Sequence, residues 1–193
     1  VLDRHLLPEV ARCGDLPFEN IVLHGNGSDD ERALQDEFPK AKFFDLEAFA
    51  GCEPHGRAIS LDHGETSAVL WTSGTTGRSK GVMQPHAVWT LWSQRHNEVF
   101  RDGVREDEAF YGCVPMYNSG GWIMNIFPAL IAGAKATIDK RFSVHDFWSR
   151  LRHFGANHTM TLGTMHLYLF EQPPRDDDAD NPLRTMIMNP VIP

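Results

Sequence analysis

Short apolar runs alternate along the chain with segments whose apolar residues recur at helical spacing. This alternation predicts an α/β protein with a largely parallel sheet flanked by helices. The runs that predict strands are Glu19–His24, Lys42–Leu46, Thr66–Trp71, Ala109–Val114, Ala136–Ile138, His158–Leu162 and Arg184–Met188. The segments that predict helices are Ser28–Phe38, Leu46–Ala50, Pro85–Phe100, Gly121–Ala134, Val144–Phe154 and Met165–Phe170, with Ser143 as the expected N-cap of the fifth.

The two ends of the sequence predict that it is a piece of a longer protein. The chain has no initiator Met and opens within an apparent helix pattern over residues 1–10, and it stops just after the last predicted strand. With 193 residues it is long enough to bury one core.

Composition narrows the class of partner. The net charge of −8 argues against nucleic acid or an anionic membrane surface as the main partner. No window is apolar enough to span a membrane. Three widely spaced cysteines, Cys13, Cys52 and Cys113, are typical of free thiols in a reducing compartment, so we expect a cytoplasmic protein.

One stretch, LWTSGTTGRSKGV over residues 70–82, carries the main chemical signal. It follows an apolar strand, at the position where α/β proteins place ligands. Glycines let the backbone approach an anion, hydroxyls donate hydrogen bonds and a lysine supplies positive charge. The residues predicted to hold phosphate are Thr72, Ser73, Gly74, Thr75, Thr76, Gly77 and Lys80, with Gly81 following.

A Walker P-loop fits this stretch poorly. Counted from Gly74, the lysine is in register at Lys80, but Ser79 replaces the required glycine and Gly81 replaces the Ser or Thr that would hold Mg²⁺. The ten histidines are scattered without a HExxH pattern, so we expect no metal site within the chain.

The stretch resembles the T-S-G-T-T-G-x-P-K-G-V signature of the adenylate-forming, AMP-binding superfamily, which includes the acyl-CoA synthetases. The match runs from Thr72 to Gly77 and from Lys80 to Val82, with Ser79 in the usual place of proline. The resemblance implies that residues 1–193 are part of the large N-terminal, AMP-binding domain of such an enzyme.

A second segment, Val114–Trp122, looks like the P-x-[F/Y]-H-x-x-G segment of the same family, with Asn118 at the histidine position. The resemblance implies that Tyr117, Asn118, Gly120 and Trp122 border the carboxylate and acyl site. It also implies that Arg141, just before an aromatic residue, approaches CoA. A looser likeness over Phe147–Trp148 and Phe170–Pro174 is to the crotonobetaine/carnitine-CoA ligase branch, and implies fatty acid or carnitine-type acid metabolism.

The resemblance implies a two-step reaction that uses a carboxylic acid, ATP with Mg²⁺, and CoA. The carboxylate attacks the α-phosphorus to give an acyl-adenylate, and the CoA thiol then displaces AMP. Lys80 and Thr76 would act on the departing pyrophosphate. The Mg²⁺ ligand, the ribose-binding aspartate and the catalytic lysine of the C-terminal domain are expected beyond Pro193, so we expect this piece alone to have little ligase activity.

Two other classes stay open at this point. Asn118 and Ser79 favour a non-catalytic nucleotide-binding descendant of the family. A P-loop-type phosphotransferase is disfavoured by the missing glycine and Ser/Thr.

Overall fold

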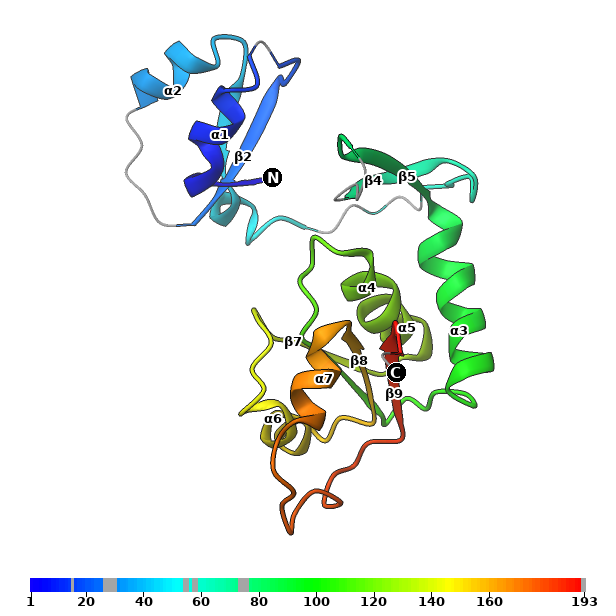
Figure 1. Cartoon of the computed structure of the whole chain (residues 1–193). Coiled ribbons are helices and arrows are strands. Elements are labelled where there is room, and N and C mark those ends of the chain that lie inside the picture. Colours follow the sequence, from blue (N-terminus) through cyan, green and yellow to red (C-terminus); the bar gives the residue numbers. More distant parts are fainter. Residues whose placement is uncertain (15, 26–30, 54–55, 57–58, 73–76, 192–193) are drawn as a thin grey trace. The chain divides into compact units, whose positions relative to one another are not determined.

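The computed structural model describes residues 1–14, 16–25, 31–53, 56, 59–72 and 77–191, which form two compact units, Val1–Ile59 and Ser60–Pro193. Figure 1 shows the elements of each unit in chain order. No helix within the described residues has the length and apolar character needed to cross a membrane. The three cysteines are free thiols; Cys13 and Cys52 are exposed and Cys113 is buried.

The first unit is a three-stranded parallel sheet in the order β1-β2-β3. Its buried side chains are mostly apolar and come from a helix before β2, from β2 itself and from the segment leading into β3. The elements are β1 (Leu2–Asp3), the 3₁₀ turn η1 (Arg4–Leu6), α1 (Leu7–Ala11), β2 (Asn20–His24), α2 (Glu31–Glu37), β3 (Lys42–Asp45) and the 3₁₀ turn η2 (Leu46–Phe49). The chain thus opens as a short strand rather than as one helix, and α1 begins only where Pro8 can occupy a first-turn position.

The second unit combines an antiparallel hairpin with a four-stranded parallel sheet in the order β7-β6-β8-β9. The hairpin is β4 (Thr66–Thr72) and β5 (Lys80–Pro85), and the sheet strands are β6 (Ala109–Gly112), β7 (Lys135–Ile138), β8 (His158–Leu162) and β9 (Thr185–Asn189). The helices are α3 (Ser93–Phe100), α4 (Ser119–Gly121), α5 (Phe127–Ala132), α6 (Phe147–Phe154) and α7 (Thr164–Phe170), with π-helical segments η3 (Val88–Trp92) and η4 (Trp122–Ile126).

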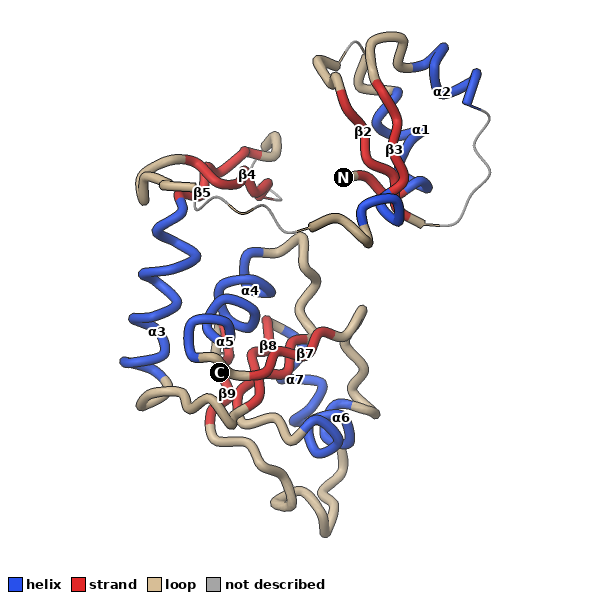
Figure 2. Tube along the Cα trace, turned by 180° about the vertical axis from the view of Figure 1, so that it is seen from behind, coloured by secondary structure: helices blue, strands red, loops and turns tan. Residues whose placement is uncertain are grey.

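Two longer helices in this unit are each interrupted by a π-helical segment. Residues 86–100 are helical through η3 and α3, and residues 119–132 through α4, η4 and α5. Figures 1 and 2 show α3 standing beside α4 and α5. Trp89 and Phe127 stack between the two helices with ring centroids 5.4 Å apart.

The core of the sheet lies between β6, α6 and α7. Tyr111, Cys113, Phe147, Leu151 and Leu169 are buried together there. Because β6 and β8 are central strands, nearly all of their side chains are buried. Their near-continuous apolar or Thr-rich runs are typical of a parallel sheet covered on both faces.

The predicted α/β class with parallel sheets is confirmed, and each predicted strand is present within one or two residues of its expected bounds. The pattern did not indicate β5, since it has no alternation; the helix predicted from Pro85 begins only where this strand ends. Ser143 as the N-cap of α6 is wrong. The cap position is Asp146, and Ser143 instead stabilises the preceding turn, where its hydroxyl donates to Asp146 Oδ2 at 2.7 Å.

Candidate functional site

The β4–β5 hairpin holds the two ends of the predicted phosphate loop together. Thr72 is paired with Lys80 across the ladder, and its hydroxyl donates to the Lys80 carbonyl oxygen at 3.4 Å. Of the residues predicted to hold phosphate, Ser73, Gly74, Thr75 and Thr76 lie outside the described residues. The described part therefore places the last hydroxyl before the loop and the lysine after it on adjacent strands.

The hairpin register puts the lysine on the same face as the hydroxyl. Leu70 pairs with Val82 and Thr72 with Lys80, and paired residues in an antiparallel ladder point to the same side. Lys80 is exposed, and no carboxylate among the described residues lies within ion-pair distance of it. This face thus presents a free positive charge beside a hydroxyl.

The second motif is a turn that starts the helix over residues 119–132. Asn118 is the N-cap of α4, and its side-chain oxygen accepts from the Gly120 N–H at 2.8 Å. A Cβ on Gly121 would lie 3.1 Å from the carbonyl oxygens of Val114 and Pro115, so this close approach of the backbone favours glycine. The indole N–H of Trp122 donates to the Met116 carbonyl at 2.6 Å.

The hairpin and this turn border one cleft of about 500 Å³. Tyr117, 83% exposed, and Asn118 approach it from the turn, and Thr72 from the hairpin. A volume of this size suits a small-molecule ligand. The residues that line it are Leu70, Trp71, Thr72, Val82, Gln84, Tyr117, Asn118 and Ser119.

Not every predicted site residue lines the cleft. Gly120 lies within α4 and Trp122 begins η4, further along the same helix, and Arg141 is exposed in the loop between β7 and α6. Gly77 is exposed, with open space around the position of a Cβ. The site as predicted is therefore brought together at Thr72, Tyr117 and Asn118, with Lys80 on the same hairpin face.

The hairpin residues that line the cleft beside Thr72 do not follow from the sequence. Leu70, Val82 and Gln84 face the cleft only because β5 pairs with β4. The sequence carries no local signal for them; in the structure, the apolar residues Trp71 and Met83 of the same hairpin are 72% and 70% exposed. Apolar side chains that remain exposed in this way are typical of binding surfaces.

A larger cleft of about 640 Å³ lies between α6, α7 and the loop after α7, and is lined by Trp148, Arg152, Phe170 and Arg175 among others. It contains none of the residues predicted to bind phosphate or acid. Arg152 and Arg175 both pair with the single carboxylate of Asp177, so each already has a partner within the chain. We therefore assign the candidate site to the smaller cleft.

Away from the cleft, Glu108 forms a buried polar hub that the sequence did not indicate. Its carboxylate bonds with Arg184, with the Arg105 backbone N–H at 2.9 Å and with His158 Nε2 at 3.1 Å. Burial raises the pKa of Glu108, but these hydrogen bonds outweigh it and lower the pKa to about 2. The hub precedes β6, at the opposite end of that strand from the cleft, so we assign it to the scaffold.

The chain is similar to acid–CoA ligases. It is 29% identical over 125 residues to a medium/long-chain-fatty-acid–CoA ligase of Mycobacterium marinum, and 28% identical over 130 residues to a crotonobetaine/carnitine–CoA ligase of Salmonella paratyphi C. These alignments cover 65% and 67% of this chain and 24% of each relative. The chain thus spans about a quarter of the length of the curated relatives it matches.

Solved structures share the fold. An anthranilate CoA ligase in complex with anthranoyl-AMP matches 96% of this chain and 35% of its own, with a TM-score of 0.72 and 18% identity. ATP-bound MatB from Rhodopseudomonas palustris matches 86% of this chain and 34% of its own, with a TM-score of 0.69 and 21% identity. The family model described as AMP-binding enzyme matches residues 3–190, and the chain therefore belongs to the AMP-binding enzyme family.

Proposed function

We propose that the full-length parent of this chain is an AMP-forming acid–CoA ligase, and that residues 1–193 are part of its N-terminal, AMP-binding domain. The observation that carries the proposal is the cleft in which Thr72 of the hairpin faces Tyr117 and Asn118 of the turn. The relatives named for fatty acids and for crotonobetaine/carnitine favour a fatty or carnitine-type acid as substrate.

In the first step a substrate carboxylate oxygen attacks the α-phosphorus of ATP, and the bond to pyrophosphate breaks. We assign the β- and γ-phosphates to the hydroxyls and backbone of Thr72, Ser73, Gly74, Thr75, Thr76 and Gly77. Lys80 would offset the charge that develops on pyrophosphate, which is electrostatic stabilisation and requires no covalent intermediate on the protein.

The other wall of the cleft would place the acid. Tyr117 and Asn118 border the carboxylate, with Gly120 and Trp122 further along the acyl side. The Asn118 side chain accepts the Gly120 N–H, so its amide N–H₂ group is left to donate to a carboxylate. Unlike a histidine at this position, it cannot carry a proton or a positive charge at neutral pH.

In the second step the CoA thiol attacks the acyl carbonyl, and AMP leaves. We assign Arg141 to CoA, since it is exposed. Mg²⁺ would neutralise triphosphate charge when bound. From the resemblance to the family, we propose that its protein ligand belongs to the rest of the parent.

Acid-dependent exchange of labelled pyrophosphate into ATP by the full-length parent tests this function. We expect exchange with a fatty or carnitine-type acid, AMP formation when CoA is added, and a loss of about 10²- to 10³-fold in the double variant Lys80→Ala/Thr76→Ala. Lys135→Ala is the matched control, because Lys135 is also an exposed lysine on a strand but lies outside the cleft.

Three results would contradict the proposal. A parent that binds ATP without any exchange would be a non-catalytic descendant. Release of orthophosphate and ADP would indicate a phosphotransferase. Exchange that survives the double variant would remove Lys80 and Thr76 from the site.

A further inference from the structure

Each wall of the cleft runs directly into a helix. β5, which starts at Lys80, leads at Pro85 into the helix over residues 86–100. The turn with Tyr117 leads through the Asn118 cap into the helix over residues 119–132. The alignment of these two helices along their axes therefore sets how the lysine strand faces the acid-binding turn.

Two polar side chains at the end of the first helix bond to backbone carbonyls of the second. Arg101 Nη2 donates to the Met124 oxygen at 3.0 Å, and Asn97 Nδ2 donates to the Pro128 oxygen at 2.9 Å. The first of these has a reason in the sequence: Pro128 has no N–H to donate to the carbonyl of Met124, four residues earlier. Arg101 supplies the missing donor.

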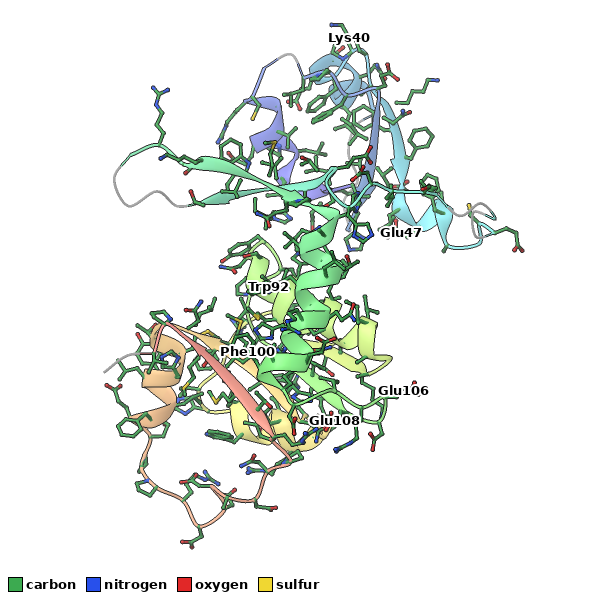
Figure 3. All side chains as sticks on the ribbon, turned by 90° about the vertical axis from the view of Figure 1, so that its right-hand side faces the viewer. Lys40, Glu47, Trp92, Phe100, Glu106 and Glu108 are labelled. Atoms are coloured by element: carbon green, nitrogen blue, oxygen red, sulfur yellow. The ribbon has the colours of Figure 1, made fainter. Side chains whose placement is uncertain are left out.

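Arg101 is itself held in place by its neighbours. Its Nη1 contacts His96 Nδ1 and lies 3.4 Å from Asn97 Oδ1, and its guanidinium lies 5.1 Å from the ring centroid of Phe110. Figure 3 shows Trp92 and Phe100 along the same helix, and their rings flank that of His96 at 5.8 and 4.6 Å. The hydrogen bond from Arg101 to the second helix therefore comes from a side chain whose conformation is fixed by its neighbours.

This arrangement costs free energy that an apolar residue would avoid. Arg101 is only 2% exposed, its Nε is buried without a hydrogen-bond partner, and no carboxylate in the described part of the chain pairs with it. A buried guanidinium without a counter-charge is a poor way to gain stability, and apolar replacements of such groups are often neutral or stabilising. A role in geometry explains why the arginine is there.

We propose that Arg101 and Asn97 are positioning residues that fix the register between the two helices and so hold the hairpin face that carries Thr72 and Lys80 across the cleft from Asn118 for adenylate formation. The inference rests on the proposed function for its link to catalysis. The register itself is a property of this fold. A slip between the helices would move Lys80 away from the charge that develops in the transition state, while most contacts with the nucleotide would remain.

The test uses the full-length parent with Arg101→Met, which keeps the apolar length but removes the donor, and Arg101→Lys, which keeps one donor. We expect kcat for pyrophosphate exchange to fall about tenfold in Arg101→Met with KM for ATP within about twofold, and to recover in part in Arg101→Lys. Leu151→Ala, in the separate core beside α6, is the control for lost stability.

A second measurement does not depend on activity. Spin labels introduced through non-canonical residues at Met83 and Leu130, both exposed, report the distance between the hairpin and α5. We expect a narrow distribution in the parent that shifts or broadens in Arg101→Met and not in Leu151→Ala.

The outcomes separate the two proposals. If the parent shows no acid-dependent exchange, the proposed function fails while the distance measurement still tests the register. An unchanged distance distribution in Arg101→Met overturns the inference, as does a loss of kcat no greater than that of Leu151→Ala at a matched melting temperature.

Discussion

The β4–β5 hairpin and the four-stranded sheet of the same unit differ in how they are held. In β6 all four residues are buried, and in β8 four of five are. In the hairpin no side chain is buried, and the apolar Trp71 and Met83 are largely exposed. The sheet is fixed by packing on both faces, whereas the hairpin is fixed by its own ladder and by the helix that follows it.

The residues that stabilise the fold and the residues expected to bind ATP therefore lie in separate parts of the unit. The residues expected to contact ATP lie where the chain packs least, so they can change with little cost to folding. The residues that hold the sheet can change only at a large cost. Substitutions matched between the two regions test this division.

The largest loss of stability is expected at the buried carboxylate of Glu108, directly before β6. Glu108→Gln removes the charge that compensates Arg184 and contacts the fully buried His158. We expect the parent to lose about 3 kcal/mol of unfolding free energy, measured by urea denaturation at pH 7. The estimate is at the low end for buried pairs because Arg184 is one-third exposed and can reach water.

Glu98→Gln is the matched control for this change. Glu98 pairs with Arg95 on the surface of α3 at 3.1 Å, and exposed pairs of this kind contribute less than about 1 kcal/mol. Equal losses in the two variants would mean that the sheet is not held by its buried hub.

A pH-dependent loss of stability is expected from the buried face of α3. Burial, and then the positive charge of Arg101, lower the pKa of His96 from 6.5 to about 4. The unfolded chain then binds a proton below pH 6.5 that the folded chain does not, so stability falls as pH decreases from 6.5 toward 4. We expect about 2.5 kcal/mol of this loss between pH 7 and 4.5 to disappear in His96→Gln.

The control is His145→Gln, since His145 is exposed before α6. Buried His158 also has a lowered pKa and will contribute its own slope in every variant. A His96→Gln protein with the pH slope of the parent would show that His96 is protonated in the fold, which would break its contact with Arg101.

The sequence predicts the packed sheet better than it predicts the exposed hairpin. The run that became β8 was predicted with its observed bounds, and the run that became β6 was predicted two residues too long, because burial demands a continuous apolar or Thr-rich pattern. The strand β5 was missed because an exposed strand needs no such pattern. The bonds of Arg101 to Met124, and of Glu108 to His158 and Arg184, were missed because these partners are 23 or more residues away and follow no local spacing.

At the candidate site, motif likeness predicted Thr72, Lys80, Tyr117 and Asn118, but not the residues that surround them. The register between β4 and β5 decides which hairpin residues face the cleft. Because β5 was not predicted, this face could not be predicted either. The capping role of Asn118 could have been predicted, since asparagine before Ser-Gly-Gly at the start of a helix is a common N-cap.

Two glycines test the contrast between the sheet and the hairpin directly. A Cβ on Gly112, at the end of β6, would lie 2.2 Å from the Asn125 amide nitrogen, in a buried side chain that donates to the Thr137 carbonyl at 3.2 Å. We expect Gly112→Ala to cost about 2 kcal/mol of unfolding free energy, because Asn125 must give up its place.

Gly81 is the matched position in the hairpin. A Cβ there would lie 2.9 Å from Val69 Cγ1, but Val69 is half exposed and can move into solvent. We expect Gly81→Ala to cost less than about 0.5 kcal/mol in the same thermal or urea unfolding experiment. If the hairpin variant costs as much as the sheet variant, the hairpin is packed against something, and the division between scaffold and site is wrong.

Apart from the matched control variants, the smallest loss of stability is expected at Asn118, where the two regions meet. Asn118→Ala removes the cap of α4 and should cost about 1 kcal/mol of unfolding free energy. Asn118→Asp keeps an oxygen that accepts the Gly120 N–H, so we expect its stability to match that of the parent. The aspartate also places a negative charge in the cleft beside the proposed triphosphate and carboxylate, so its KM for ATP or for the acid should rise. Loss of activity in Asn118→Asp at full stability would show that Asn118 acts on substrate. If only Asn118→Ala loses activity, and it loses stability to the same extent, then Asn118 acts only as the helix cap.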